Sequence, residues 1–335
     1  MKNVLLLNLG SPKSTDKQHV REYLEEFMSD DYVLDFPKFF QQLILRLFIL
    51  PFRPSQAKEA YEEIWEEDGS PLIINTQKIA DALSKQTGWD VDIAMRYQYP
   101  SIEESILRFK EKRIKELHVI PLYPHNASST TVSTNEEVKK VVKKIYPELQ
   151  LKFIEPFYNH PDYIDSLARS IKPHLNGLDK LIFSYHGIPI RHVTQSCDGG
   201  KQCYEHDNCC STDSKEYCRC YKCNTYMTSK FTADKLNLSN SDWKMTYQSR
   251  VSVVSPYWLK PYTDKELENF PNNGVENIGI VCPSFVADCL ETLEEIGMRG
   301  KESFMESGGK SFTYIPCLND DKHFISALEK IISPH

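Results

Sequence analysis

Leu-Ile-Phe-Ser-Tyr-His-Gly-Ile, residues 181–188, is an apolar run of strand length that stops at His186 and turns at Gly187. A second stretch, residues 281–295, leaves a predicted strand at Pro283 and enters a predicted helix. On that helix Asp288, Glu291 and Glu295 have the spacing i, i+3 and i+7, so the three carboxylates share one face. An imidazole at one strand end and acids beyond another are the groups that accept protons and bind a divalent cation.

The chain repeats itself at an offset of 160 residues. Residues 156–171 and 316–331 align without gaps and share a Pro, an Asn, a Ser and the final Ile. Three further pairs follow predicted strands in the same order in both halves: Gly10 and Gly187, Arg96 and Arg250, Pro121 and Pro283. Each half contains four predicted strands with helical segments between them. This order predicts an α/β fold with two Rossmann-like domains, residues 1–172 and 173–335, each built on a parallel four-stranded sheet.

Ligands of open parallel sheets bind beyond the carboxyl ends of the strands. The residues expected at or just past such ends are Gly10, Arg96, Tyr123, His186, Arg250 and Ser284. We therefore predict one ligand-binding cleft bordered by both halves. No Gly-x-Gly-x-x-Gly or Walker-type loop follows a predicted strand, which argues against a nucleotide cofactor.

Composition is typical of a cytoplasmic enzyme. The 335 residues carry a formal net charge of −7 without a basic run, which argues against a nucleic-acid partner. The apolar run at residues 4–7 is too short for a signal peptide, and no stretch approaches the roughly 20 apolar residues of a membrane span. In a reducing compartment, the ten cysteines are not expected to form disulfides.

These motifs, taken together and in order, resemble those of ferrochelatase, the enzyme family that inserts ferrous iron into a porphyrin late in haem synthesis. The resemblance covers nearly the whole chain. Its segments are residues 7–12, Arg96-Tyr97, residues 121–131, 184–189, 247–250, 258–264 and 282–295. It implies insertion of Fe²⁺ into protoporphyrin IX with release of two protons. The alternatives are coproporphyrin as substrate, cobalt as metal, or a non-catalytic tetrapyrrole or metal carrier with the same cleft.

The resemblance also implies roles for individual residues. His186 and Glu291 match the catalytic pair that contacts the iron or takes pyrrole protons, with Asp288 and Glu295 behind them as a proton and metal path. The matching porphyrin-binding positions are Leu9, Arg96, Tyr97, Tyr123 and Trp258. These roles have simpler alternatives. His186 would then be a structural histidine, and the three acids would face water. Arg96 and Arg250 would be ion-paired between the halves.

Residues 39–52 form the most apolar segment of the chain. Gln41, Gln42, Arg46 and Pro51 interrupt it, so it cannot cross a bilayer. The sequence alone favours a core helix here. The resemblance instead implies an apolar lip at about residues 36–53, which would permit peripheral contact with the inner face of the membrane.

Seven cysteines are crowded into residues 197–223, directly after the His186 motif. This stretch is poor in aliphatic residues, so it cannot form its own core, and thiolates select zinc or iron–sulfur clusters. The spacing of Cys203, Cys210, Cys218 and Cys223 favours a [2Fe–2S] cluster, which some bacterial ferrochelatases carry on cysteines inserted at this place. Structural zinc and unliganded redox thiols are the alternatives. The separate Cys282, Cys289 and Cys317 are predicted to be small buried hydrophobes.

Overall fold

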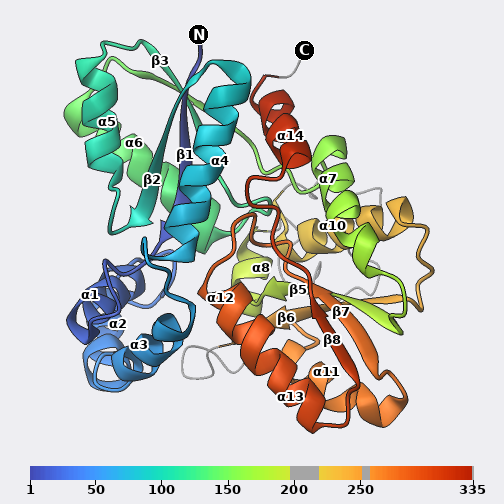
Figure 1. The fold of residues 1–335 in the computed structure, drawn as a ribbon. Coiled ribbons are helices and arrows are strands. Elements are labelled where there is room, and N and C mark those ends of the chain that lie inside the picture. Colours follow the sequence, from blue (N-terminus) through green and yellow to red (C-terminus); the bar gives the residue numbers. More distant parts are fainter. Residues whose placement is uncertain (197–218, 251–256, 334–335) are drawn as a thin grey trace. The chain divides into compact units, whose positions relative to one another are not determined.

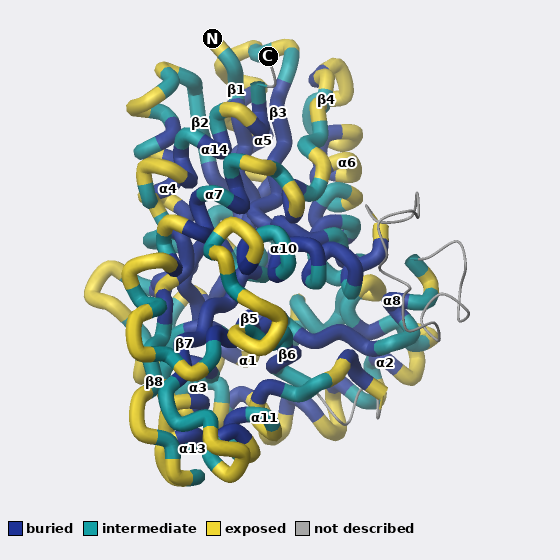
Figure 2. The backbone as a smooth tube through the Cα atoms, turned by 90° about the vertical axis from the view of Figure 1, so that its right-hand side faces the viewer, coloured by how far each residue is buried: buried dark blue, intermediate teal, exposed yellow. Residues whose placement is uncertain are grey.

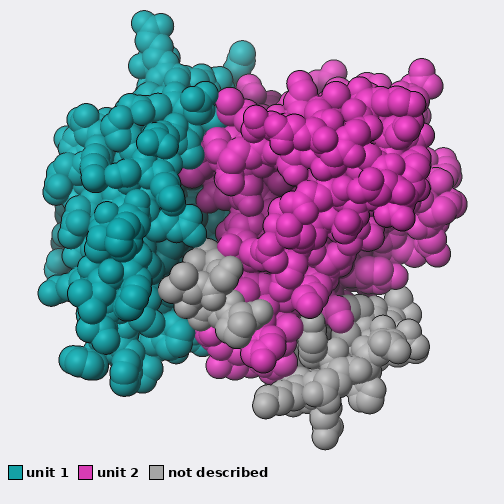
Figure 3. Space-filling model, turned by 90° about the horizontal axis from the view of Figure 1, so that it is seen from below, with its two compact units in different colours: residues 1–123, 128–155, 328–335 teal, residues 124–127, 156–327 magenta. Residues whose placement is uncertain are grey.

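The computed structural model of the chain describes residues 1–196, 219–250 and 257–333 (Figure 1). The chain divides into two compact units, coloured separately in Figure 3. The first comprises residues 1–123, 128–155 and 328–335, and the second comprises residues 124–127 and 156–327. Each unit is built on one four-stranded sheet whose paired strands are all parallel.

The first sheet has the order β2-β1-β3-β4. Its strands are β1 (Asn3–Gly10), β2 (Asp90–Tyr97), β3 (Glu116–Pro121) and β4 (Gln150–Phe153). Val4 of the central strand β1 pairs with Val91 on one side and His118 on the other. Residues 4–7 are fully buried, as an uninterrupted apolar run requires when helices cover both faces of a parallel sheet.

Helices of the first unit connect these strands. They are α1 (Lys17–Met28), α2 (Lys38–Ile44), η1 (Leu45–Ile49), α3 (Arg53–Ile64), α4 (Pro71–Thr87), α5 (Ile102–Glu111), η2 (Ser128–Val132) and α6 (Ser133–Ile145). Local sequence determines where several of these helices begin or end. Pro71 begins α4 and the left-handed Gly88 ends it, while Ser101 and Glu104 form a capping box on α5.

The second sheet has the equivalent order β6-β5-β7-β8. Its strands are β5 (Lys180–His186), β6 (Trp243–Gln248), β7 (Asn277–Val281) and β8 (Ser311–Tyr314). The helices of this unit are α7 (Pro161–Ile171), η3 (Lys172–His174), α8 (Ile190–Ser196), α10 (Tyr221–Lys235), α11 (Thr263–Asn269), η4 (Pro271–Asn273), α12 (Leu290–Thr292), η5 (Leu293–Gly300) and α13 (Lys301–Glu306). The last helix, α14 (Lys322–Ile332), begins in the second unit, and its residues from 328 onward belong to the first. The predicted fold class, two parallel four-stranded sheets related by a repeat, is confirmed.

The repeat has a physical counterpart in the glycines after the two central strands. A Cβ on Gly10 would lie 2.0 Å from the carbonyl oxygen of Tyr97 in β2, and one on Gly187 would lie 2.8 Å from that of Gln248 in β6. Both glycines therefore permit the same close approach of the central strand to its neighbour. Residues 156–171 and 316–331 also match, because they lead into α7 and α14 after the fourth strand of each sheet.

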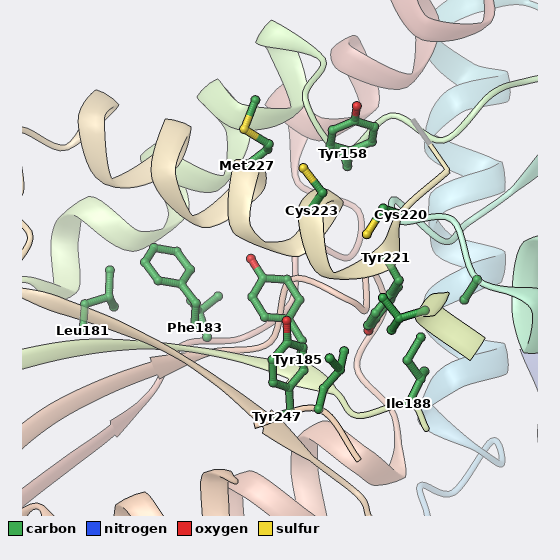
Figure 4. Close-up of a cluster of buried hydrophobic side chains, with 14 of the residues drawn as sticks. Tyr158, Leu181, Phe183, Tyr185, Ile188, Cys220, Tyr221, Cys223, Met227 and Tyr247 are labelled. Carbon is green, nitrogen blue, oxygen red and sulfur yellow. The ribbon is translucent and has the colours of Figure 1, made fainter. Parts of the chain in front are cut away.

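A mixed core lies between β5 and α10 in the second unit. Leu181, Phe183 and Tyr185 of β5 form one buried cluster with Tyr221 and Met227 of α10 (Figure 4). The inner face of α10 is also polar: Asn224, Thr225, Thr228, Ser229 and Thr232 are completely buried, within the dark-blue part of the chain in Figure 2. Hydrogen bonds satisfy the first four of these groups, as between Ser229 and the hydroxyl of Tyr185, 2.7 Å apart, whereas the Thr232 hydroxyl has no partner among the described residues.

Two sequence predictions about helices need correction. The apolar segment is not a core helix, because Phe39, Phe40, Leu43, Leu47, Phe48 and Phe52 are all exposed. Its buried side contains Leu45, Ile49 and Leu50 together with Gln41, whose amide donates to the carbonyls of Asp30 and Leu34. The helix after β7 begins at Leu290, so Asp288 precedes it, and from Leu293 it is a π-helix. None of the described helices is long and apolar enough to span a bilayer.

Candidate active site

His186 is the last residue of β5, and its ring orientation is fixed by its own loop. Nδ1 lies 2.7 Å from the carbonyl oxygen of Gly187. A carbonyl oxygen only accepts, so Nδ1 carries a proton. The side chain is partly exposed, with the ring of Phe285 edge-on at 6.4 Å between centroids. The basic nitrogen that the ring offers at the carboxyl end of the central strand is therefore Nε2.

The backbone of His186 is held from both sides. Its carbonyl accepts a 2.7 Å hydrogen bond from the buried phenol of Tyr221, and its N–H donates to Ser284 Oγ at 3.3 Å. Ser284 Oγ and the Tyr221 oxygen are 3.0 Å apart, and the Tyr221 proton is already donated, so Ser284 donates here. Burial raises the pKa of Tyr221, which keeps it a donor at neutral pH. The first residue of α10 thus orients the histidine.

Glu291 and Glu295 stand on the helix that follows β7, Glu291 in α12 and Glu295 in the π-helix η5. The carboxylate of Glu295 accepts a 2.8 Å bond from the N–H of Ser249 and a second bond from its hydroxyl. Ser249 has φ of 62°, a conformation that costs a non-glycine residue energy. Gln248 donates to the carbonyl of Glu291 at 2.7 Å. The end of β6 thus holds both acids, through the backbone of one and the carboxylate of the other.

The electrostatics of Glu295 connect these groups. Burial raises its pKa, the hydrogen bonds from Ser249 and the charge of His186 oppose this, and the charge of Glu291 adds to it. The net shift is upward. A carboxyl group that both charges affect, and whose pKa is raised, holds a proton at a higher pH than an ordinary glutamate does.

Asp288 lies apart from this pair. It is buried before the helix, and its carboxylate accepts from Asn319 at 2.7 Å, Thr292 at 3.1 Å and the N–H of Cys317 at 3.3 Å, as well as from the hydroxyl of Tyr314. These donors account for both oxygens. The contacts are those of an anchor between the β7 loop and the segment after β8, and the predicted place of Asp288 on a proton or metal path stays a prediction.

In the first unit, Arg96 near the end of β2 belongs to a compact polar cluster. Its guanidinium lies 2.6 Å from the buried carboxylate of Asp30 and donates to Ser133 Oγ at 2.8 Å. The same carboxylate accepts from the hydroxyls of Tyr97 at 2.8 Å and Ser133 at 2.5 Å, and from the N–H of Tyr32 at 2.8 Å. Burial alone would raise the pKa of Asp30, but these bonds and the Arg96 charge hold it below its ordinary value.

The other predicted porphyrin contacts differ in exposure. Leu9 in β1 is partly exposed, whereas Tyr97, Tyr123 and Trp258 are buried. Arg250 ion-pairs with Asp264 at 2.6 Å, and both residues belong to the second unit, so this is not the ion pair between the halves that was the alternative from sequence. The roles of the porphyrin-contact residues stay predictions.

Three of the candidate cluster ligands, Cys203, Cys210 and Cys218, lie outside the described residues. Cys223 is buried in the first turn of α10. Within residues 1–196, 219–250 and 257–333, no group of three or more His, Cys, Asp or Glu side chains is placed to hold a metal ion. Cys282, Cys289 and Cys317 are buried as predicted, and burial raises the pKa of each thiol, which keeps it protonated.

Sequence reasoning missed the residues that orient the site. Gln248 and Ser249 were inside a recognised motif, but nothing in it indicated a contact with the acids. Tyr221 lies in another segment of the chain from His186, and Asp30 lies in a loop without a motif. Ser284 was expected just past a strand end, but its contact with the His186 backbone was not. Only a pattern of polar residues at strand ends could have pointed to Gln248 and Ser249.

Comparison with solved structures defines the class of fold. SirB from Bacillus subtilis with Fe³⁺ matches with a TM-score of 0.53 and 11% identity over 99% of this chain and 96% of that one. The sirohydrochlorin chelatase SirB from Bacillus subtilis subspecies spizizenii, in complex with cobalt, matches with a TM-score of 0.52 and 10% identity over 99% and 94%. The chain therefore has the fold of these chelatases.

Comparison of sequences identifies the family. The ferrochelatase family model matches residues 1–335. Ferrochelatase of Pseudomonas fluorescens (strain Pf0-1) is 40% identical over 97% of this chain and 95% of its own length. That of Ectopseudomonas mendocina (strain ymp) is 39% identical over 97% and 96%. The chain belongs to the ferrochelatase family, porphyrin metal chelatases that insert ferrous iron into a porphyrin in haem biosynthesis.

Proposed function

We propose that His186 and Glu291 carry the catalytic step of iron insertion in this chain, and that Glu295 takes protons onward from them. The observation that carries the proposal is the His186 ring, whose Nδ1–H is committed to the Gly187 carbonyl, so that Nε2 is the nitrogen left to accept a proton or contact the metal. The influence of both His186 and Glu291 on the pKa of Glu295 supports a connected group.

The chemistry requires such groups. A porphyrin must lose two pyrrole protons while Fe²⁺ exchanges its water ligands for ring nitrogens. A neutral imidazole can accept a proton and can also contact the ferrous substrate. The carboxylate of Glu291 offsets the cation charge, and Glu295, with a raised pKa, accepts the proton that must leave.

Replacement of His186 by Ala tests the proposal. We expect turnover to fall by about 10²–10⁴-fold, the contribution of a general base, with porphyrin binding and folding retained. His174→Ala, a histidine of η3 away from β5, is the matched control and should keep full activity. A His186→Ala protein with more than about a tenth of wild-type turnover would refute the assignment.

For the substrate, we favour protoporphyrin IX over coproporphyrin. Extra propionates need extra cations, and the guanidinium of Arg96 is already neutralised by Asp30. Leu9, Tyr97, Tyr123 and Trp258 are retained as the remaining porphyrin contacts. Turnover of the two porphyrins by the same preparation, with Fe²⁺ and with Co²⁺, tests both the porphyrin and the metal. Absence of any insertion would favour a non-catalytic carrier.

A [2Fe–2S] cluster on Cys203, Cys210, Cys218 and Cys223 is the proposed cofactor, supported by seven thiols within 27 residues. A bound cluster would supply folding free energy to a segment poor in apolar side chains. Protein purified without oxygen should be reddish-brown, with about two irons and two acid-labile sulfides per chain. Cys223→Ser should remove the colour and Cys282→Ser should not. One zinc and no sulfide would point to a zinc site.

We also propose cytoplasmic location with peripheral contact to the inner face of the membrane. The six exposed apolar side chains of residues 39–52 support this contact, because five of them are carried by one short helical segment, α2 and η1, and Phe52 follows it. Sedimentation with lipid vesicles should capture the wild type, and Phe39→Ser with Phe48→Ser should release it. Equal capture of both proteins would contradict the contact.

A further inference from the structure

Gln248, the last residue of β6, is buried, and the two ends of its side-chain amide face different partners. Its Oε1 accepts a 2.7 Å hydrogen bond from the hydroxyl of Ser184 and lies 3.6 Å from the thiol sulfur of Cys282. Its Nε2 donates to the carbonyl oxygen of Glu291 at 2.7 Å and lies 3.5 Å from a carboxylate oxygen of Glu295. A carbonyl oxygen only accepts, so the NH₂ end of the amide must face Glu291.

The backbone of Gln248 contacts the loop that holds the His186 ring. His186 pairs in register with Gln248 across the parallel strands β5 and β6. The N–H of Gly187 donates to the Gln248 carbonyl at 2.8 Å, and the carbonyl of Gly187 accepts from His186 Nδ1. Gln248 therefore contacts the histidine loop through its backbone. Through its side chain it contacts the acidic helix (α12 and η5), which carries Glu291 and Glu295.

We propose that Gln248 is a positioning residue that holds the acidic helix in place relative to His186. Its bond to the backbone carbonyl of Glu291 locates the helix itself and not only one side chain. Ser184 fixes the orientation of the amide, because without the Ser184 hydroxyl Oε1 would keep only a thiol, a weak donor. The positioning role rests on the proposed function of His186 and Glu291.

Steady-state insertion of Fe²⁺ and of Zn²⁺ into protoporphyrin IX measures this role. Gln248→Met keeps the length of the side chain and the backbone bond to Gly187, and it removes both ends of the amide. We expect kcat to fall about 10–10²-fold, as for a catalytic group displaced by about 1 Å, while the KM values for porphyrin and metal stay within about twofold. A kcat within about twofold of the wild type would overturn the positioning role.

Thr246→Val is the matched control. Thr246 is fully buried and lies two residues before Gln248, on the same face of β6, with its hydroxyl 2.8 Å from that of Thr263. Valine keeps the shape and removes this hydrogen bond, so Tm should fall by a few degrees while kcat stays within about twofold of the wild type. If Thr246→Val and Gln248→Met lost kcat equally, turnover would follow stability alone, and the positioning role would be rejected.

Ser184→Ala tests the orientation of the amide. In the otherwise wild-type protein we expect kcat to fall about three- to tenfold, because the amide can then turn its NH₂ group away from Glu291. In the Gln248→Met background the same change should lower kcat by less than about twofold, since no amide is left to orient. Effects that multiply would show that Ser184 acts independently of Gln248. If Gln248→Met does not fold, Ser184→Ala decides alone, and a kcat loss no larger than that of Thr246→Val overturns the proposal.

The proposed function can fail separately. If Glu291→Gln retains full turnover, the assignment of the acidic row (Asp288, Glu291 and Glu295) is wrong, whatever Gln248 does. If Glu291→Gln is inactive and Gln248→Met has the kcat of the wild type, the assignment of the acids stands and only the positioning role of Gln248 is rejected.

Discussion

We expect the carboxylate of Asp30 to be the group that contributes most to the stability of the end of β2. The Asp30 side chain is 5% exposed, and its carboxylate accepts hydrogen bonds from Arg96, Tyr97, Ser133 and the N–H of Tyr32. Asp30→Asn keeps the shape of the side chain and removes its charge. It also replaces one acceptor oxygen by an NH₂ group, a donor that faces the other hydrogen-bond donors of the cluster. The guanidinium of Arg96, whose side chain is 14% exposed, would lose its counter-charge.

Removing one partner of a buried ion pair costs about 3–5 kcal/mol. Because Asn can still accept from Tyr32, we expect the lower end, about 3 kcal/mol, which corresponds to about 6–12 °C in Tm. The loss should depend on pH. The folded-state pKa of Asp30 is depressed, so its contribution is present at neutral pH and is lost as the pH falls below about 4 through that pKa. The variant and the wild type should therefore converge in acid.

Urea unfolding followed by circular dichroism measures this difference. The adjacent Asp31 is the matched control, because it pairs with Lys38 at 2.5 Å while both side chains are more than half exposed. Asp31→Asn should change the free energy of unfolding by less than about 1 kcal/mol. If Asp30→Asn cost no more than Asp31→Asn at pH 7, the cluster would not stabilise this unit as argued.

Glu291→Gln should lower turnover strongly with little change in porphyrin affinity, and Glu295→Gln should lower turnover less. If steady-state assays gave the reverse order of the two turnover losses, the assigned order of the acids would be contradicted. Tyr221→Phe removes the donor to the His186 carbonyl, so kcat should fall several-fold and Tm by a few degrees, consistent with a net loss of about 1 kcal/mol, while porphyrin KM is kept. Gly10→Ala places a Cβ within 2.0 Å of a β2 carbonyl oxygen and should yield little folded protein in a solubility assay, whereas Gly88→Ala, with open space, should remain soluble.

Apolar patterning was sufficient to predict the two parallel sheets. Runs such as residues 4–7 and 181–183 are buried on both faces, so their strand identity follows from composition and length alone. The repeat was also readable, because equivalent positions have equivalent steric needs, as at Gly10 and Gly187. His186 could be placed at a strand end for the same reason.

The acidic row was predicted less well. Glu291 and Glu295 are on one helix as expected, but Asp288 is not, and the π-helix from Leu293 had no sequence signal. A π-turn is stabilised by contacts such as the ion pair between Glu294 and Arg299. These residues are five positions apart, and whether their side chains meet depends on the geometry of the helix. The exposed face of residues 39–52 was likewise hidden, since an apolar run does not reveal whether anything covers it.

The sequence by itself determined the fold class, the order of the apolar runs that become strands, and the residue types available for proton and metal chemistry. These features depend on periodicity and on local sterics. Only the tertiary structure decided how those side chains are held. The hydrogen bonds of Ser249 to Glu295 and the burial of Asp30 against Arg96 come from segments distant in sequence. The proton on His186 Nδ1 is instead held by the carbonyl of the next residue, Gly187, in the loop conformation that follows β5. Such contacts form where packing of the chain brings a backbone group and a side chain together. The hydrogen-bond partner of a buried polar group then depends on distance and burial, and not on position along the chain.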